Sequence, residues 1–137
     1  MMVVEGGFPF NVNASDNSNT GGGIQMRAQE TCNGNSGPHK FSEWFNTSCY
    51  QQPAVSTFGN ERRNNLTGPH NTNLDLSVFK EFPIFENLKF QWRTDAFSAL
   101  NHPLPDQPNN SCCTGTFGEV TGWGGARTIQ MSAKMLW

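Results

Sequence analysis

Apolar and polar side chains alternate along two neighbouring stretches in the second half of the chain. In residues 73–82, apolar side chains occupy nearly every second position, and Lys80 interrupts the apolar side near its end. The alternation resumes over residues 88–100, after the sequence PIFEN at 83–87, which we interpret as a tight reversal. A period of two residues is typical of a half-buried strand, and two such runs around a short turn predict a β-hairpin.

The last stretch, residues 126–137, carries the same alternation. Its apolar side holds Ile129, Met131, Ala133, Met135 and Trp137. Residues 101–125 lie between the hairpin and this stretch and are rich in proline, glycine and asparagine, which predicts a long connection. No amphipathic helix is evident, so the sequence predicts an all-β fold of antiparallel strands at 73–82, 88–100 and 126–137, joined by long Asn/Gly/Pro-rich loops.

The first half of the chain is predicted to be loop-rich. Residues 1–72 lack sustained periodicity, and residues 13–23 have the Asn, Asp, Ser and Gly content of turns. The aromatic cluster at residues 41–50 is interpreted as a local hydrophobic contact in a loose segment, in preference to a ligand-stacking platform. We therefore expect residues 1–137 to form a single, incomplete β domain.

The length of the predicted strands favours a membrane setting over a water-soluble sandwich. Both kinds of sheet alternate apolar and polar positions, so alternation alone does not separate them. Strands of about 9–11 residues match a tilted crossing of a bilayer. Aromatic side chains also fall on the apolar side, several of them near strand ends.

The chain resembles the C-terminal portion of large TonB-dependent outer-membrane receptors of the Oar-like type. The likeness extends upstream to residues 6–23 and so covers nearly the whole chain. It rests on several motifs in a compatible order: WFNTSCYQQPAVSTFGNERRNNLTGP at 44–69, NLDLSVFKEFPI at 73–84, LKFQWRTDAFSALNHP at 88–103, TFGEV at 116–120 and ARTIQMSAKMLW at 126–137.

This resemblance implies a large barrel that imports a solute across the outer membrane, with energy coupled from the inner membrane. In that family a carboxypeptidase-regulatory-like domain and a plug precede the barrel. The chain departs from the family pattern at His70, where a glycine is usual after Gly-Pro, and at its terminal Trp137, where a phenylalanine is usual. A terminal aromatic is retained, so the resemblance implies a barrel assembly signal formed by Ile129, Met131, Met135 and Trp137.

The resemblance also implies that the polar sides of the strands face a barrel lumen, where they would contact plug or solute. The chain is long enough for only the last few strands, so we expect no transport from it alone. Its partners would be the remainder of a barrel, or further copies that pair through exposed strand edges. The implied lumen-facing residues are Lys89, Gln91, Arg93, Asp95, Gln130 and Lys134.

Composition and charge exclude some functions. The formal net charge is −2, and the nine Lys and Arg residues are spread thinly, so no basic patch is available for nucleic acid. No apolar run approaches the ~20 residues of a membrane helix. The first ten residues do not resemble a secretion signal, so we expect any such signal to lie upstream. The expected location is the outer membrane, or a secreted or periplasmic location if the chain stands alone.

Cysteines and histidines suggest two further hypotheses. Cys32 and Cys49 could close a loop worth ~3 kcal/mol, which would make the chain a non-catalytic, disulfide-stapled β-rich binding module. The adjacent Cys112 and Cys113 are not expected to bond to each other, because neighbouring residues seldom achieve disulfide geometry.

The second hypothesis is a small secreted hydrolase assisted by a divalent metal. His39, His70 and His102 each neighbour a proline and could hold the metal, but their wide spacing favours solvated loop histidines. We identify no catalytic motif, and we expect no cofactor unless these histidines bind a metal.

Overall fold

The computed structural model describes residues 1–19 and 25–137. The chain forms two compact units: residues 1–5, 71–104 and 123–137 make the sheet unit, and residues 6–70 and 105–122 make the loop unit. The final part of the predicted turn region 13–23 lies outside the described residues. The regular structure of the described residues consists of antiparallel strands and two short 3-10 turns, which confirms the predicted all-β fold.

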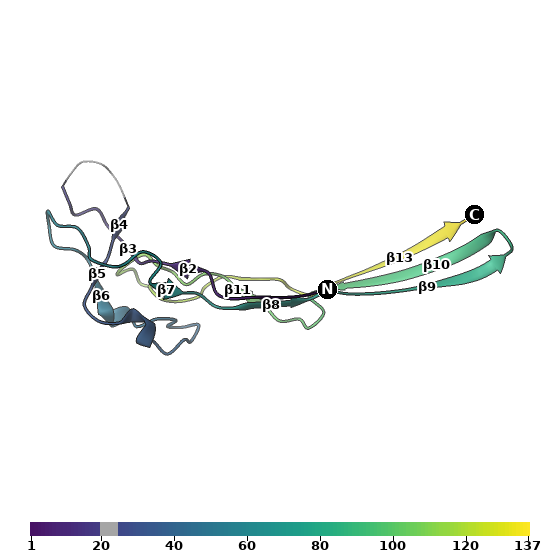
Figure 1. The fold of residues 1–137 in the computed structure, drawn as a ribbon, viewed down its shortest axis with the longest axis horizontal. Helices are drawn as coiled ribbons and strands as arrows, with labels where there is room; N and C mark the ends of the chain where they lie inside the picture. The colour runs from purple at the N-terminus through teal and green to yellow at the C-terminus, as the bar shows by residue number, and fades with distance from the viewer. Residues whose placement is uncertain (20–24) are drawn as a thin grey trace. The chain divides into compact units, whose positions relative to one another are not determined.

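The sheet unit is built on three long antiparallel strands (Figure 1). They are β9 (Leu76–Phe85), β10 (Leu88–Phe97) and β13 (Thr128–Leu136). The order is β13-β10-β9, so the central strand β10 pairs with both neighbours over nearly its whole length. The hairpin and the third strand are therefore present, as the alternation predicts.

The boundaries of the hairpin differ from the prediction. The strand predicted at 73–82 runs through Pro83 to Phe85, so the reversal occupies only Glu86 and Asn87. The interpretation of PIFEN as the turn is therefore wrong for residues 83–85, which belong to β9. In the structure Pro83 lies opposite Lys89, beside a register shift in β9, which is an edge strand. Edge strands and bulges tolerate proline because its missing N–H costs no ladder hydrogen bond there.

The second strand of the hairpin is shorter than predicted, because a turn at residues 98–100 follows Phe97. The chain before β9 is also interrupted, at Asp75. It forms a separate strand, β8 (Asn71–Leu74), which pairs with β1 (Met2–Glu5). The Asp75 side chain accepts a hydrogen bond from the Ser98 backbone N–H at 3.0 Å and so links the start of β9 to the end of β10.

The loop unit contains only short elements. Three two-residue ladders join β2 (Pro9–Phe10) to β7 (Leu66–Thr67), β3 (Asn13–Ala14) to β4 (Met26–Arg27), and β5 (Gln29–Glu30) to β6 (Tyr50–Gln51). Two 3-10 turns, η1 (Gly34–Ser36) and η2 (Thr47–Cys49), are each capped by the asparagine that precedes them. Elsewhere, β11 (Leu104–Pro105) pairs with β12 (Trp123–Gly124).

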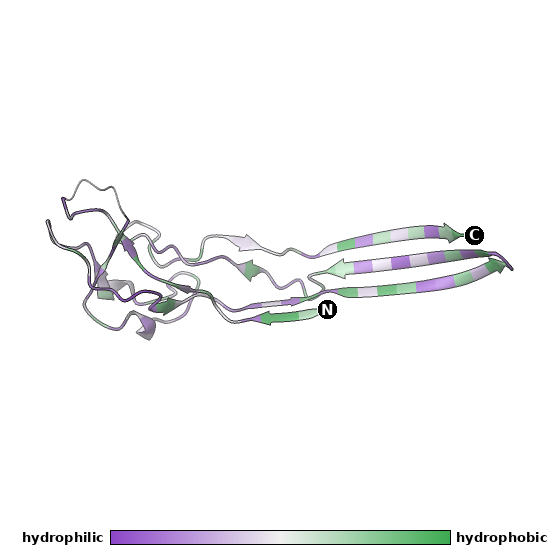
Figure 2. Ribbon diagram, turned by 45° about the horizontal axis from the view of Figure 1, so that its top comes forward, coloured by the Kyte–Doolittle hydropathy of each residue, from purple (hydrophilic) through white to green (hydrophobic). Residues whose placement is uncertain are grey.

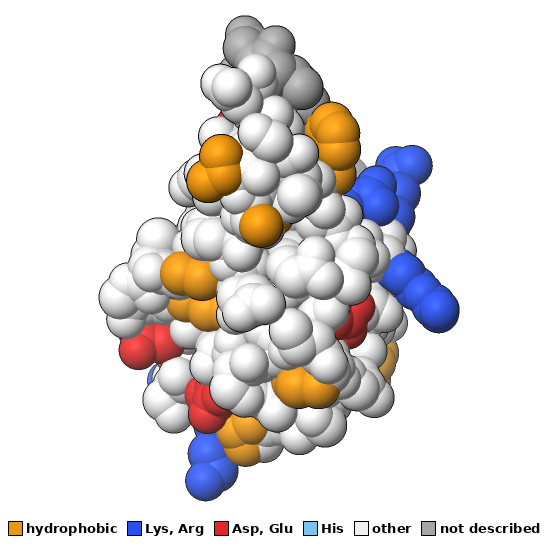
Figure 3. All heavy atoms as spheres, turned by 90° about the vertical axis from the view of Figure 1, so that its left-hand side faces the viewer, with side chains coloured by type: hydrophobic (Ala, Val, Ile, Leu, Met, Phe, Trp, Pro, Cys, Tyr) orange, Lys and Arg blue, Asp and Glu red, His pale blue; other side chains and the backbone are white. Residues whose placement is uncertain are grey.

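These short elements enclose a hydrophobic core, which the sequence did not predict. Phe45, only 1% exposed, makes ring contacts with Phe10, Tyr50 and Phe117 at centroid distances of 5.2–5.8 Å. The aromatic cluster at 41–50 is therefore more than a local contact, because it joins segments far apart in the chain. On the face of the loop unit seen in Figure 3, hydrophobic side chains are separated by polar surface.

Backbone hydrogen bonds join the two long segments of the loop unit. The N–H of Asn13 donates to the carbonyl of Asn110 at 2.8 Å, and the N–H of Cys112 donates to the carbonyl of Asn13 at 2.6 Å. Further along, the N–H of Trp44 donates to the carbonyl of Gly118 at 2.8 Å. Residues 6–70 and 105–122 thus fold as one body.

A buried carboxylate accepts hydrogen bonds from the backbone within the segment 6–70. Glu61 is 2% exposed, and both of its carboxylate oxygens accept from the backbone N–H of Val12, at 2.9 and 2.8 Å. Burial raises the pKa of Glu61 to about 7, although the Val12 hydrogen bond favours the charged form.

The structure contains two disulfides, one of which contradicts an expectation. Cys32 and Cys49 are joined across a sequence separation of 17 residues. Cys112 and Cys113 are also joined, so the expectation that they do not bond is wrong. The chain turns here, with φ at Cys113 of 69°, and this backbone conformation accompanies the bond between adjacent residues.

The burial of Glu61 predicts that the loop unit loses stability as pH rises. The folded carboxyl holds its proton more tightly than the unfolded one, whose ordinary pKa is 4.5. The contribution of Glu61 to the free energy of unfolding is therefore complete below pH 4.5 and is lost as pH rises to about 7. The free energy of unfolding should fall by about 3 kcal/mol over this range. Urea denaturation, followed by the methyl NMR signals of Val12 at about pH 5 and about pH 8, measures this. Glu61→Gln should remove most of this pH dependence of the free energy of unfolding. An unchanged pH dependence in the variant would contradict its attribution to Glu61.

The two disulfides should differ in their effect on stability. Cys32→Ser opens a loop of 17 residues and should destabilise the loop unit by about 3 kcal/mol, because the unfolded chain regains the entropy of that loop. Cys113→Ser is the matched control, since a bond between adjacent residues closes almost no loop. Amide hydrogen exchange over residues 41–50 measures both variants. Equal loss of protection in the two would argue against the loop-entropy explanation.

Candidate functional site

The register of the long sheet gathers the apolar positions of three strands onto one face. Phe90 of β10 lies opposite Phe82 of β9 and Met135 of β13, and the rows that follow repeat this arrangement. Bands of hydrophobic and hydrophilic residues alternate along these strands in Figure 2. The apolar face, as we name it, comprises Leu76, Val78, Phe82, Phe90, Trp92, Thr94, Ala96, Ile129, Met131, Ala133 and Met135, together with Lys80.

This apolar face is not covered by any part of the sheet unit. Val78 is 63% exposed and Met131 is 68% exposed, values far above those of core residues. Lys80 lies with its Nζ 5.4 Å from the centroid of the Phe82 ring, so its aliphatic stem runs along the apolar face. A contiguous apolar surface of this kind marks contact with a membrane or another protein.

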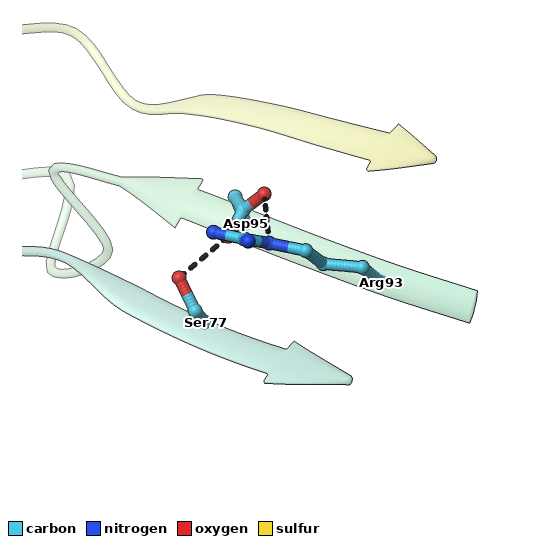
Figure 4. Close-up of polar contacts among 3 residues, drawn as sticks. All are labelled: Ser77, Arg93 and Asp95. Atoms are coloured by element: carbon cyan, nitrogen blue, oxygen red, sulfur yellow. Dashed lines mark hydrogen bonds and ion pairs between the residues drawn. The ribbon is translucent and has the colours of Figure 1, made fainter. Parts of the chain in front are cut away.

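The opposite face carries a hydrogen-bonded polar cluster (Figure 4). Arg93 Nε donates to both carboxylate oxygens of Asp95, each at 2.9 Å, and Ser77 Oγ donates to Asp95 Oδ1 at 2.5 Å. Asp95 is only 9% exposed, and its carboxylate is held by Arg93 of the same strand and by Ser77 of the neighbouring strand β9. Alternation does not distinguish Ser77 from the other polar residues of its strand, so it is not among the residues implied for a lumen.

The other polar residues predicted for a lumen share this face by register. Gln91 lies opposite Lys134 and donates from Nε2 to Glu81 Oε1 at 2.9 Å. Gln130 lies opposite Asp95, and Lys89 lies opposite Leu136. Phe79, 64% exposed and opposite Arg93, is an apolar exception on this face, as are Phe97 and Leu136 at its two ends. The polar face, as we name it, comprises Ser77, Phe79, Glu81, Lys89, Gln91, Arg93, Asp95, Gln130, Ser132 and Lys134.

Asp95 on the polar face is engaged by both Arg93 and Ser77. The Ser77 hydroxyl contacts a carboxylate, but no hydrogen bond in the described residues gives it an imidazole that would act as general base. Both oxygens of Asp95 are engaged by Arg93, which leaves this cluster as a fixed pair of opposite charges.

The structure does not bring the three histidines together. His39 packs edge-on against Trp44, with ring centroids 5.4 Å apart, and His70 and His102 are exposed loop residues. Among residues 1–19 and 25–137, no group of three His, Cys, Asp or Glu side chains could hold a metal ion. The metal-assisted hydrolase hypothesis gains no support from these positions.

The residues of the implied assembly signal lie along β13 and just beyond it. Ile129, Met131 and Met135 belong to the apolar face, whereas Trp137 follows the end of the strand and is 94% exposed. Near the β9–β10 turn, Trp137 and Leu136 line a hollow of about 360 Å³ together with Glu81, Glu86, Asn87 and Lys89.

Comparison with known proteins identifies the family. No helix among the described residues is long and apolar enough to cross a membrane. Neither the curated proteins nor the solved structures gave a match to the chain. The family model described as an outer membrane beta barrel domain matches residues 1–130, which include the whole loop unit, β9 and β10. The chain therefore belongs to the outer membrane β-barrel domain family.

Proposed function

We propose that the chain supplies closing strands and outward-facing loops of a TonB-dependent receptor barrel. The observation that carries the proposal is the register of the long sheet, which keeps one face apolar and exposed across three strands and the other face polar. The strands β9 and β10 have 10 residues and β13 has 9, which suits a tilted bilayer crossing of ~9–11 residues.

In this proposal the apolar face contacts lipid and the polar face lines the barrel. Lys89, Gln91, Arg93, Asp95, Gln130 and Lys134 then point toward the plug or the passing solute. A fixed Arg93–Asp95 pair is compatible with that position, because a buried or partly buried charge must be paired to be tolerated. The receptor-type motifs and the family match support an import role for the complete barrel.

Loop lengths give the direction of the strands. Outer-membrane barrels have short periplasmic turns and longer extracellular loops. The β9–β10 turn contains only Glu86 and Asn87. The loop unit, in contrast, contains the connection 6–70 between β1 and β8 and residues 105–122 of the connection between β10 and β13. The turn therefore faces the periplasm in this proposal, and the loop unit faces the outside of the cell.

The barrel needs strands beyond those described. In the long sheet β9 and β13 each pair on one side only, and a sheet edge with unpaired backbone groups is not tolerated in hydrocarbon. Small barrels need about eight strands to close. The missing strands come from the rest of a receptor polypeptide, and self-association of the chain is the alternative source. No transport is expected from the three long strands alone.

A second function, that of a disulfide-stapled binding module, fits the loop unit as a part of the same barrel protein. The loop unit has its own core, and the Cys32–Cys49 disulfide closes one of its loops. An outward-facing body with these properties is suited to recognise a ligand before transport.

Arginine substitution tests the two faces of β13. Met131 lies on the apolar face and its neighbour Gln130 on the polar face. Met131→Arg should destabilise the chain, assembled with further copies in lipid vesicles so that its strand edges are paired, by about 2–4 kcal/mol, because it places a charge in the hydrocarbon. Gln130→Arg is the matched control and should change stability by less than about 1 kcal/mol. Urea titration of the vesicle-bound protein measures both, and equal effects would reject the assignment of the faces.

The state of the chain in plain buffer provides a separate test. The exposed apolar face and the open sheet edges should drive association without detergent, and detergent micelles should disperse the aggregates. Size-exclusion chromatography with light scattering measures this. A monodisperse monomer in buffer, with no loss on concentration, would overturn the bilayer assignment.

A further inference from the structure

A polar hollow on the loop unit is not explained by the barrel. It has a volume of about 670 Å³ and lies between two segments, residues 30–35 and residues 60–65. Ligand sites typically occupy ~300–1,000 Å³, so its size suits a small molecule. Four asparagines, one glutamate and one arginine supply most of its polar lining: Glu30, Asn33, Asn35, Asn60, Arg62 and Asn65.

Hydrogen bonds hold the walls of this hollow in place. The Asn60 side chain pairs with the backbone of Glu30, accepting from its N–H at 2.6 Å and donating to its carbonyl at 3.0 Å. Asn65 Nδ2 donates to the Glu30 carboxylate at 2.9 Å, and Asn35 Nδ2 donates to the Asn65 carbonyl at 2.7 Å. The neighbouring Cys32–Cys49 disulfide anchors the same segment. A ligand therefore meets side chains that are already oriented.

Several polar atoms of the wall retain hydrogen-bonding capacity. Asn33 uses its Oδ1 to cap η1, which leaves its Nδ2 group as a donor. Asn35 uses its Nδ2, which leaves its Oδ1 as an acceptor. Arg62 adds further donors, and Glu30 adds a second carboxylate oxygen. Donors and acceptors are thus available side by side.

This combination defines the chemistry of a ligand. Hydroxyl groups both donate and accept, so a polyhydroxylated molecule can satisfy both kinds of atom. Glu30 and Arg62 carry opposite charges, so the wall has no net charge that would select a polyanion or a polycation. None of the lining side chains is aromatic or a large aliphatic, so an apolar ligand would find no matching surface.

We propose that this hollow binds an uncharged saccharide. Its role as a capture site outside the cell rests on the proposed function, which places the loop unit there, and it names the substrate class of that receptor. Because the hollow is open and polar, we expect a saccharide dissociation constant in the millimolar range. Weak binding of this kind allows the ligand to dissociate and enter the barrel.

The test uses the full chain refolded in a detergent without a sugar headgroup, such as lauryldimethylamine oxide. Maltose, cellobiose and lactose are titrated separately, with inorganic phosphate as the charged comparison. NMR signals of the Asn33 and Asn35 side-chain amides and of the Arg62 backbone report binding. We expect at least one disaccharide to shift these signals in a saturable way, and phosphate to leave them unchanged.

Two variants locate the site. Asn33→Asp keeps the oxygen that caps η1 but removes the donor group, and Arg62→Met keeps the aliphatic stem but removes the guanidinium. Each should weaken saccharide binding about fivefold or more, a loss equivalent to about one hydrogen bond. Arg63→Met is the matched control, because Arg63 is an exposed neighbour that does not line the hollow, and it should leave binding unchanged.

Three results would overturn the proposal: no saturable shift with any of the disaccharides, preferential binding of phosphate, or equal affinity in Asn33→Asp, Arg62→Met and Arg63→Met. These measurements do not depend on a bilayer. Failure of the saccharide site is therefore distinguishable from failure of the barrel assignment, which the arginine substitutions in β13 test on their own.

Discussion

The pairing register of β9, β10 and β13 is the constraint on which the assignment of the long sheet depends. Side chains alternate between faces with a period of two, so a slip of one residue in any strand would mix the apolar and polar faces. Phe82 lies opposite Phe90 because the short turn at Glu86 and Asn87, with its adjacent register shift, sets the hairpin, and the separate pairing of β13 with β10 brings Met135 into the same row. The two-sided surface follows from these two registers together.

The two units are stabilised in different ways. The loop unit buries aromatic and aliphatic side chains from distant segments around Phe45, as a small water-soluble domain does. The long sheet buries almost none of its large apolar side chains, and its internal order comes from ladder hydrogen bonds and from polar contacts such as Ser77–Asp95. One chain therefore combines a part that encloses its own core with a sheet whose apolar side chains are left exposed.

The sequence predicted the long strands well because alternation is a local signal. It failed where structure depends on distant contacts. Phe10, Phe45 and Phe117 are spread over the loop segments without periodicity, so nothing in the sequence indicated that they share a core. Glu61 lies in a polar run and gives no sign of its burial. The contact of Asp95 with Ser77 depends on the register of β9 against β10, which alternation alone does not fix.

The joint core of the loop unit has a consequence for the order of events in folding. Cys112 and Phe117 pack with residues from the first loop, so that core cannot form until the second loop has been synthesised. Contacts between residues so far apart in the chain form slowly, because a long loop must close before any contact compensates for the lost entropy. The loop unit can thus complete its core only after β9 and β10 have been synthesised, and its last residues precede β13 in the chain.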